Sequence, residues 1–141
     1  SWHTYCILGD GECNEGSVWE AAMSASHFKA TNMTAFVDRN RLMMDGPTEK
    51  VMNVEPFADK WRAFGFIVRE ADGHDFTDLA NAIDYALQEK AAPVVIIANT
   101  IKGRGVDFME NEVKWHYGSV DSELAARAHA SVDRMYGAIS N

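Results

Sequence analysis

An aspartate between two glycines, and an asparagine further along the chain, are the residues whose types and spacing best suit chemistry. Gly9-Asp10-Gly11 ends the apolar run of residues 5–8, and Asn40 follows the apolar run of residues 33–37. If these runs are neighbouring parallel strands, Asp10 and Asn40 meet at the carboxyl-end edge of the sheet, where open α/β folds bind ligands. One carboxylate and one amide oxygen, with other positions left open, suit a Mg²⁺ ion that holds a phosphate.

Both residues also have an ordinary explanation, because aspartate, asparagine and glycine are frequent in turns. The metal–phosphate hypothesis depends on both residues arriving at strand ends, one βαβ unit apart. Gly11 would let the backbone approach the phosphate closely, because it carries no side chain.

The composition limits the classes of partner. The chain has 141 residues, enough for one domain, and a formal net charge of −8 from 13 basic and 21 acidic residues. This balance argues against a nucleic-acid binder, which needs a basic surface. An anionic ligand would therefore need a local device such as a metal ion or a helix N-terminus.

The same sequence gives expectations about the cellular location of the protein and about whether the chain is a whole domain. The chain has no apolar run near the roughly 20 residues of a membrane span, and no visible signal peptide. Cys6 is expected in the core and Cys13 in a loop; the pair gives little support for zinc or a disulfide, so a reducing cytoplasm is the expected location. Because a strand begins so soon after Ser1, we expect a piece of a larger domain.

The elements that must position these residues alternate between strand and helix. The patterns predict strands at 4–8, 33–37, 66–69 and 94–98, and helices at 16–29, 56–64, 76–90 and 123–136. The unbroken apolar run 94–98 is typical of a strand covered on both faces. The alternation predicts an α/β fold with right-handed crossovers, a parallel sheet and helices on both faces.

Turn signals separate these elements. Asp45-Gly46-Pro47 and Asp72-Gly73-His74-Asp75 predict turns, with Asp75 capping the helix that follows. Asp121 or Ser122 is expected to cap the last helix. Lys102-Gly103-Arg104-Gly105 predicts a flexible loop, and His74 is expected to support its turn rather than to do chemistry.

Longer stretches of the sequence resemble a known family. Gly9-Asp10-Gly11 with Asn40 resembles the thiamine diphosphate-binding motif, which several enzyme families share. The wider sequence resembles transketolase, and most of all the amino-terminal subunit of transketolases split into two polypeptides. The segments that carry this resemblance are Leu8-Gly9-Asp10-Gly11-Glu12, Glu15-Gly16, Trp19-Glu20-Ala21, Val37-Asp38-Arg39-Asn40, Asp45-Gly46, Asp72-Gly73-His74-Asp75, Asn99-Thr100-Ile101-Lys102-Gly103-Arg104-Gly105 and Trp115-His116-Tyr117-Gly118.

The resemblance covers nearly the whole chain. It implies that residues 1–141 are the carboxy-terminal part of the domain that binds diphosphate and Mg²⁺, without its upstream part and without the pyrimidine-binding domain. It implies that Asp10, Asn40 and the backbone carbonyl of Leu42 are Mg²⁺ ligands. It also implies that the N–H of Gly11 meets the diphosphate, with Gly9 and Glu12 beside it.

The resemblance assigns two further residues, and a basic loop offers a third candidate; each has an ordinary alternative. Glu15 matches a glutamate of a carboxylate network at the subunit interface; a first-turn helix glutamate is the alternative. His116 matches a histidine that approaches the diphosphate and the substrate, although Tyr117 interrupts the simpler His-Gly pattern and a packed histidine is the alternative. Lys102 and Arg104 lie in a glycine-rich loop that could close on phosphate, and a solvated basic loop is the alternative.

The resemblance implies transfer of a two-carbon ketol unit from a ketose to an aldose, both sugar phosphates. It implies thiamine diphosphate and Mg²⁺ as cofactors, and it implies a dimer or heterotetramer whose other member is a carboxy-terminal, pyrimidine-binding subunit. Because that partner carries the activating glutamate, the chain alone is expected to be inactive. The alternatives are a related enzyme such as deoxyxylulose-phosphate synthase, and a truncated, non-catalytic remnant.

Overall fold

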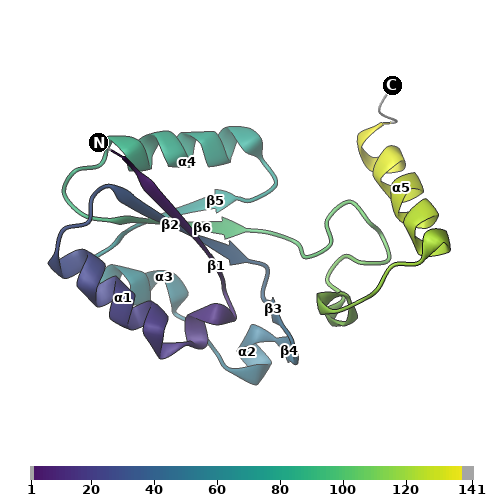
Figure 1. Ribbon diagram of the computed structural model, residues 1–141, viewed down its shortest axis with the longest axis horizontal. Helices are drawn as coiled ribbons and strands as arrows, with labels where there is room; N and C mark the ends of the chain where they lie inside the picture. Colours follow the sequence, from purple (N-terminus) through teal and green to yellow (C-terminus); the bar gives the residue numbers. More distant parts are fainter. Residues whose placement is uncertain (1, 138–141) are drawn as a thin grey trace.

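The computed structural model describes residues 2–137 and contains a four-stranded sheet with helices around it (Figure 1). The strands are β1 (Thr4–Gly9), β2 (Met33–Arg39), β5 (Ile67–Asp72) and β6 (Val94–Asn99). All neighbours pair in parallel, in the order β1-β2-β6-β5. The predicted α/β class and the parallel sheet are therefore confirmed.

Helices cover both faces of the sheet, as the sequence predicts. Helices α1 (Gly16–His27) and α3 (Phe57–Ala63) lie on one face, and α4 (Phe76–Gln88) lies on the other (Figure 1). Each face has its own apolar cluster, one around Val37 and Trp61 and the other around Ala82 and Ile96. The predicted strand of residues 94–98 is buried along its length, because β6 lies between two other strands and under helices on both sides.

The predicted caps are present at two helices. The side chain of Asp75 accepts hydrogen bonds from the backbone N–H groups of Thr77 and Asp78, at 2.7 and 3.3 Å, at the start of α4. Of the two candidates for the last helix, α5 (Ser122–Tyr136), the cap is Asp121, which accepts from the N–H of Leu124 at 2.8 Å. These bonds satisfy N–H groups that have no partner within the helix.

The sequence patterns missed several short elements. They are the 3-10 helices η1 (Glu12–Asn14) and η2 (Val113–His116), the hairpin strands β3 (Leu42–Met43) and β4 (Gly46–Pro47), and helix α2 (Thr48–Val51). All have four residues or fewer, too short for an apolar periodicity to develop. They matter because several predicted site residues lie on them.

The expected core position of Cys6 was wrong. Cys6 is exposed because β1 is an edge strand, whereas Cys13 lies in the β1–α1 connection, as expected, and is the buried residue of η1. Burial, with the nearby carboxylates of Glu12 and Asp10, raises the pKa of the Cys13 thiol to about 12. Both thiols are free, and Cys13 packs in the core as a small apolar side chain.

The carboxy-terminal helix stands apart from the sheet (Figure 1). Helix α5 packs against the segment that leaves β6: Ser131 Oγ accepts from the N–H of Asp107 at 2.9 Å, and Arg134 pairs with the Asp107 carboxylate at 2.7 Å. The guanidinium of Arg127 lies over the ring of Phe108, 4.8 Å from its centroid. Among residues 2–137, no helix has the length and apolar character needed to cross a membrane.

Candidate functional site

The residues predicted to bind the cofactor lie around one cavity at the carboxyl ends of β1 and β2. Gly9 pairs with Asp38 in the sheet, so Asp10 and Asn40 leave adjacent strands at the same edge. The cavity has a volume of about 430 Å³. Its lining residues are Gly9, Asp10, Gly11, Glu12, Asn40, Leu42, Met43, Met44, Lys102 and His116.

Two walls enclose this cavity, and they come from different parts of the chain. The sheet wall consists of residues 9–12, 40 and 42–44, which follow β1 and β2 directly. The loop wall consists of Lys102 and His116, which lie on the long segment between β6 and α5. The fold brings these two residues to Asp10 from more than ninety positions away in the sequence.

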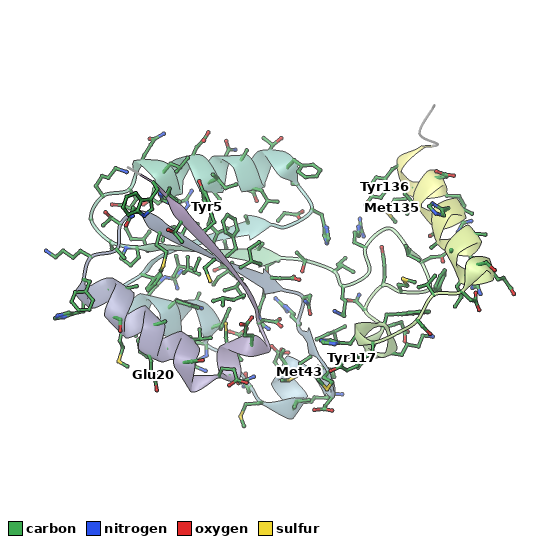
Figure 2. All side chains as sticks on the ribbon, viewed as in Figure 1. Tyr5, Glu20, Met43, Tyr117, Met135 and Tyr136 are labelled. Carbon is green, nitrogen blue, oxygen red and sulfur yellow. The ribbon has the colours of Figure 1, made fainter. Side chains whose placement is uncertain are left out.

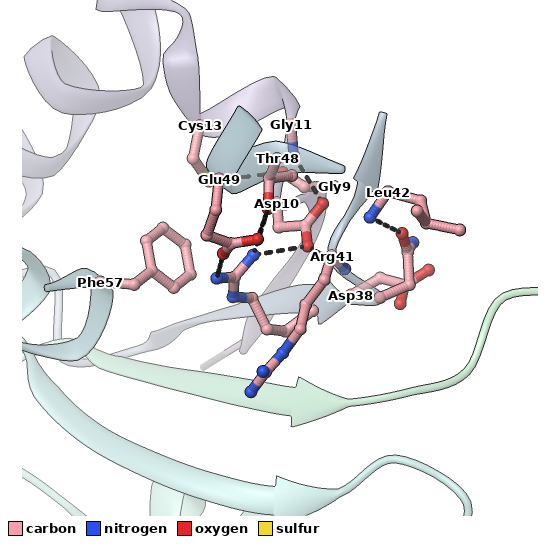
Figure 3. A network of polar contacts seen from close by, with 12 residues as sticks. Gly9, Asp10, Gly11, Cys13, Asp38, Arg41, Leu42, Thr48, Glu49 and Phe57 are labelled. Atoms are coloured by element: carbon pink, nitrogen blue, oxygen red, sulfur yellow. Dashed lines mark hydrogen bonds and ion pairs between the residues drawn. The ribbon is translucent and has the colours of Figure 1, made fainter. Parts of the chain in front are cut away.

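Asp10 is the most firmly held side chain of the sheet wall. It is 1 % exposed. Its Oδ1 accepts from the N–H of Gly11 at 2.7 Å, and its Oδ2 accepts from Arg39 Nη1 at 2.9 Å and from the N–H of Arg41 at 2.5 Å (Figure 3). Since a carboxylate oxygen has two acceptor sites, Oδ2 is filled and Oδ1 keeps one for a further ligand.

Arg39 is a buried residue of this site that the sequence patterns did not single out. Its side chain is 2 % exposed and pairs with three carboxylates: Asp10, Glu49 at 2.5 Å and Glu55 at 2.8 Å. It also donates to Thr48 Oγ1 at 3.1 Å. Arg39 therefore connects the carboxylate of Asp10 to helix α2 and to the segment before α3.

In this network, each charged group stabilises the charged form of its partners. Burial alone would lower the pKa of Arg39, but its hydrogen bonds to Glu55, Glu49 and Asp10 raise that pKa above the ordinary value. Burial is the largest influence on the pKa of Glu49 and raises it, but the hydrogen bonds from Arg39, from the backbone and from Thr48, together with the charge of Arg39, lower that pKa below the ordinary value. The N–H of Phe57 and the guanidinium of Arg39 lower the pKa of Glu55. All three groups are held in their charged forms.

A signal for Arg39 was present in the sequence. In β2 the side chains of Val37 and Arg39 point to the same face, because strand side chains alternate, and Asp38 points to the other. Val37 is fully buried and Arg39 is 3 % exposed. An arginine two positions after a core valine needs carboxylate partners, and Asp10, Glu49 and Glu55 provide them.

Asn40 and Leu42 form the corner where the chain leaves β2. Asn40 Oδ1 accepts from the N–H of Leu42 at 2.9 Å, and Leu42 pairs with Pro47 in the β3–β4 hairpin. Arg41, between them, has a positive φ of 64°, which turns the chain sharply. This turn places the amide of Asn40 and the backbone of Leu42 at the cavity that Asp10 lines.

Glycines leave the backbone open at the start of the sheet wall. A Cβ on Gly11 would lie 2.9 Å from the Cβ of Met43, which is closer than side chains approach. The N–H of Gly11 is donated to Asp10, and the N–H of Gly9 is donated to Glu12 Oε2 at 3.0 Å. The Gly11 N–H expected to meet a diphosphate thus holds Asp10 in this structure.

The loop wall is held by fewer and more exposed contacts. His116 lies in η2 and lines the cavity even though Tyr117 interrupts the expected pattern. The hydroxyl of Tyr117 donates to Met44 Sδ at 3.2 Å, so η2 rests on the hairpin of the sheet wall (Figure 2). Trp115 Nε1 donates to the carbonyl of Phe108 at 2.9 Å.

Glu15 is the one predicted site residue that the structure does not bring to the cavity. It occupies the N-cap position of α1, its side chain makes no capping hydrogen bond, and it is exposed. The residue therefore lies outside the ring of cavity-lining residues. Its expected part in a carboxylate network between subunits stays a prediction.

The donor set fits a metal–diphosphate group. A carboxylate with a free acceptor site, an amide oxygen and a nearby backbone carbonyl are hard oxygen ligands of the kind that Mg²⁺ prefers. On the opposite side, the ammonium of Lys102 and the imidazole of His116 are donors for an anion. The residues of the two walls are thus chemically complementary to the two parts of such a group.

Comparisons with known proteins agree with this chemistry. The family described as transketolase, thiamine diphosphate binding domain, matches residues 1–137. An apulose-4-phosphate transketolase subunit from Phocaeicola vulgatus is 42 % identical over 125 residues, which are 86 % of this chain and 43 % of that protein. A 6-deoxy-6-sulfo-D-fructose transketolase subunit from a Clostridium species is 38 % identical over 130 residues, 92 % of this chain and 47 % of that protein. The chain spans less than half the length of these two relatives.

The fold agrees as well. The crystal structure of transketolase from Campylobacter jejuni superposes with a TM-score of 0.87 at 28 % sequence identity. The superposition covers 94 % of this chain and 21 % of that enzyme.

Proposed function

The chain belongs to the transketolase thiamine diphosphate-binding domain family, and from this premise we propose that its cavity holds the diphosphate of thiamine diphosphate through Mg²⁺. The observation that carries the proposal is the convergence of Asp10, Asn40, Lys102 and His116 on one cavity. When bound, this cofactor supplies the carbon nucleophile for transfer of a two-carbon ketol unit. The protein's part is to bind, orient and charge-balance it.

Each wall has its own part in this proposal. Asp10, Asn40 and the carbonyl of Leu42 would hold Mg²⁺, with Gly9, Gly11 and Glu12 beside the diphosphate. Lys102 would neutralise diphosphate charge from the loop wall, and His116 would donate a hydrogen bond to the diphosphate or the substrate. Support comes from the position of all these residues around the cavity and from the free acceptor site of Asp10.

A binding measurement tests the proposal directly. Thiamine diphosphate should bind the purified chain in the presence of Mg²⁺, as followed by calorimetry, and removal of the metal with EDTA should abolish the binding. Asp10→Asn should weaken binding, since it removes the only formal charge assigned to the metal, while Asp59→Asn on the exposed face of α3 should not. Binding that is the same with and without EDTA would contradict the metal assignment.

We further propose that the complete enzyme transfers a ketol unit from a ketose to an aldose, and that its partner is a pyrimidine-binding subunit. The names of the two relatives describe ketoses that bear a phosphate or a sulfo group. These names support sugar phosphates, or similarly charged ketoses, as substrates. The free thiols Cys6 and Cys13 are consistent with a cytoplasmic location.

An exposed apolar edge supports the need for further protein contacts. Strand β1 forms one edge of the sheet, and its Ile7 is 78 % exposed, as is Trp2 just before the strand. Met23 on α1 is exposed too, whereas Trp19 on the same helix packs against Trp61 and Phe64. Native sheets rarely leave such an edge uncovered.

The activity proposal predicts no ketol transfer by these 141 residues alone. The partner would normally position the reacting groups and activate the cofactor by proton transfer, and the isolated chain would lack both. Acid–base catalysis alone contributes a factor of about 10²–10⁴ to the reaction rate. Adding the amino-terminal part of the domain together with the pyrimidine-binding partner should give turnover, and Asp10→Ala should abolish it. Robust turnover by the isolated chain would contradict the proposal that this chain supplies only the diphosphate side of the active site. It would point to Glu15 as a source of activation.

A further inference from the structure

The turn Asp72-Gly73-His74-Asp75 lies next to the loop wall, although neither the fold class nor the cofactor assignments give it a role. It follows β5, and the loop that carries Lys102 follows β6, the neighbouring strand. His74 and Lys102 line a second cavity of about 530 Å³ beside the first. The two loops therefore leave the sheet side by side.

The turn is rigid on its own side. Asp72 Oδ1 accepts from the N–H of His74 at 2.9 Å, and Asp78 Oδ2 accepts from the N–H of Asp72 at 2.8 Å. Asp75 caps α4, so the turn is fixed to the first turn of that helix. Local side-chain bonds of this kind hold a turn in one conformation.

The turn also fits closely against the exit of β6. The N–H of Gly73 donates to the carbonyl of Asn99 at 2.8 Å. A Cβ on Gly73 would lie 2.4 Å from Thr100 Cγ2 and 3.0 Å from the Asn99 carbonyl oxygen. Only glycine allows this approach, which brings the next residue, His74, to the following loop.

His74 reaches across to the backbone just before Lys102. Its Nε2 accepts from the N–H of Ile101 at 2.7 Å. Since Nε2 accepts, the proton of the neutral ring lies on Nδ1. On the other side of this loop, Thr100 Oγ1 donates to Asp38 Oδ1 on β2. The backbone of residues 100–101 is held from both flanks, and Lys102, the next residue, lines the cofactor cavity.

We propose that His74 is a positioning residue for the cofactor site: by holding the N–H of Ile101, it places Lys102 at the cavity. This inference rests on the proposed function for the identity of the ligand, but its structural part does not. His74 itself lines the second cavity and not the cofactor cavity, so it acts through Lys102. The Asp72–Asp75 turn then connects the end of β5 to the loop wall through hydrogen bonds.

The structural part is tested without any cofactor. His74→Ala should increase hydrogen exchange at the Ile101 amide by about two- to tenfold, the range for loss of one hydrogen bond, and should shift the Lys102 amide resonance. His74→Gln, whose Oε1 can reach as far as Nε2, should retain part of the protection. His129→Ala, on the exposed surface of α5, is the matched control and should change neither signal.

The functional part is tested by a double-mutant cycle on thiamine diphosphate affinity with Mg²⁺. His74→Ala should weaken binding by about two- to tenfold, but should have no further effect in a Lys102→Ala background. Additive losses, or unchanged Ile101 exchange in His74→Ala, would overturn the proposal. If the unmodified chain binds no thiamine diphosphate, the proposed function fails, while the exchange measurement still decides whether His74 anchors the loop.

Discussion

The sheet wall and the loop wall of the cavity carry a buried carboxylate and an ammonium group, but they are built in different ways. The sheet wall follows directly from two paired strands, and its key carboxylate is buried with Arg39 and accepts three hydrogen bonds. The loop wall lies on a segment between β6 and α5 that is fixed by hydrogen bonds at exposed or partly buried positions. One wall is part of the folded core, and the other is attached to it.

This difference separates stability from binding. A change in the sheet wall removes a partner from a buried ion pair, so it should affect folding and ligand binding together. A change in the loop wall removes a donor near solvent, so it should affect binding with little effect on folding. Mutations in the two walls should therefore be distinguishable by measuring both properties on each variant.

Asp10→Ala should have the largest effect. It leaves the buried guanidinium of Arg39 without its best-buried partner, and breaking a buried pair costs about 3–5 kcal/mol of unfolding free energy. Metal-dependent cofactor binding should be lost as well. Urea unfolding measures the first effect and calorimetry the second. Asp59→Ala, which removes an exposed pair with Arg62, is the control and should change the unfolding free energy by less than about 1 kcal/mol.

Arg39→Met should lower the unfolding free energy by a similar or slightly smaller amount than Asp10→Ala. Asp10 then stays buried without its cation, whereas the carboxylates of Glu49 and Glu55 can turn to water. Adding Asp10→Asn should recover part of the loss, because the remaining buried charge is removed. Urea unfolding of both single variants and the double variant measures the coupling. Strictly additive losses would show that the two side chains do not act as a pair.

Lys102→Ala should weaken cofactor binding by roughly ten- to a hundredfold, because a hydrogen bond to a charged group contributes about 1.5–3 kcal/mol. Its unfolding free energy should stay within about 0.5 kcal/mol of the unmodified chain, as for other surface changes. Calorimetry and urea unfolding on the same samples give both values. Lys60→Ala on α3 is the matched control, and a large loss of stability in Lys102→Ala would contradict the separation of the two walls.

Acid should weaken the carboxylate–arginine network behind the sheet wall by a smaller, graded amount. The folded pKa values of Glu49 and Glu55 lie below the ordinary value of 4.5, so their stabilisation is present above pH 4.5 and is lost as the pH falls through the folded values. Thermal unfolding between about pH 6 and pH 3 should show this loss. The variant with both Glu49→Gln and Glu55→Gln should have a flatter pH profile; an unchanged profile would contradict the role of the network.

Much of the sheet wall could be predicted from the sequence. Two apolar runs, each ending in a polar residue, place Asp10 and Asn40 at one edge once the sheet is parallel, since parallel strands end on the same side. The family resemblance predicted His116, and the glycine-rich basic loop made Lys102 a candidate. No local rule connects either residue with positions so distant in the sequence. The Asp75 cap followed from local hydrogen bonding alone.

Only the tertiary structure decided the rest. Cys6, expected in the core, is exposed because β1 is an edge strand, and strand order is set by long-range pairing and not by local pattern. The partners of Arg39 come from three separate segments, which meet only after the β3–β4 hairpin and α2 have formed. The contact of His74 with Ile101 likewise exists because β5 and β6 are neighbours. The sequence determined which groups reach strand ends, and packing determined which of them meet.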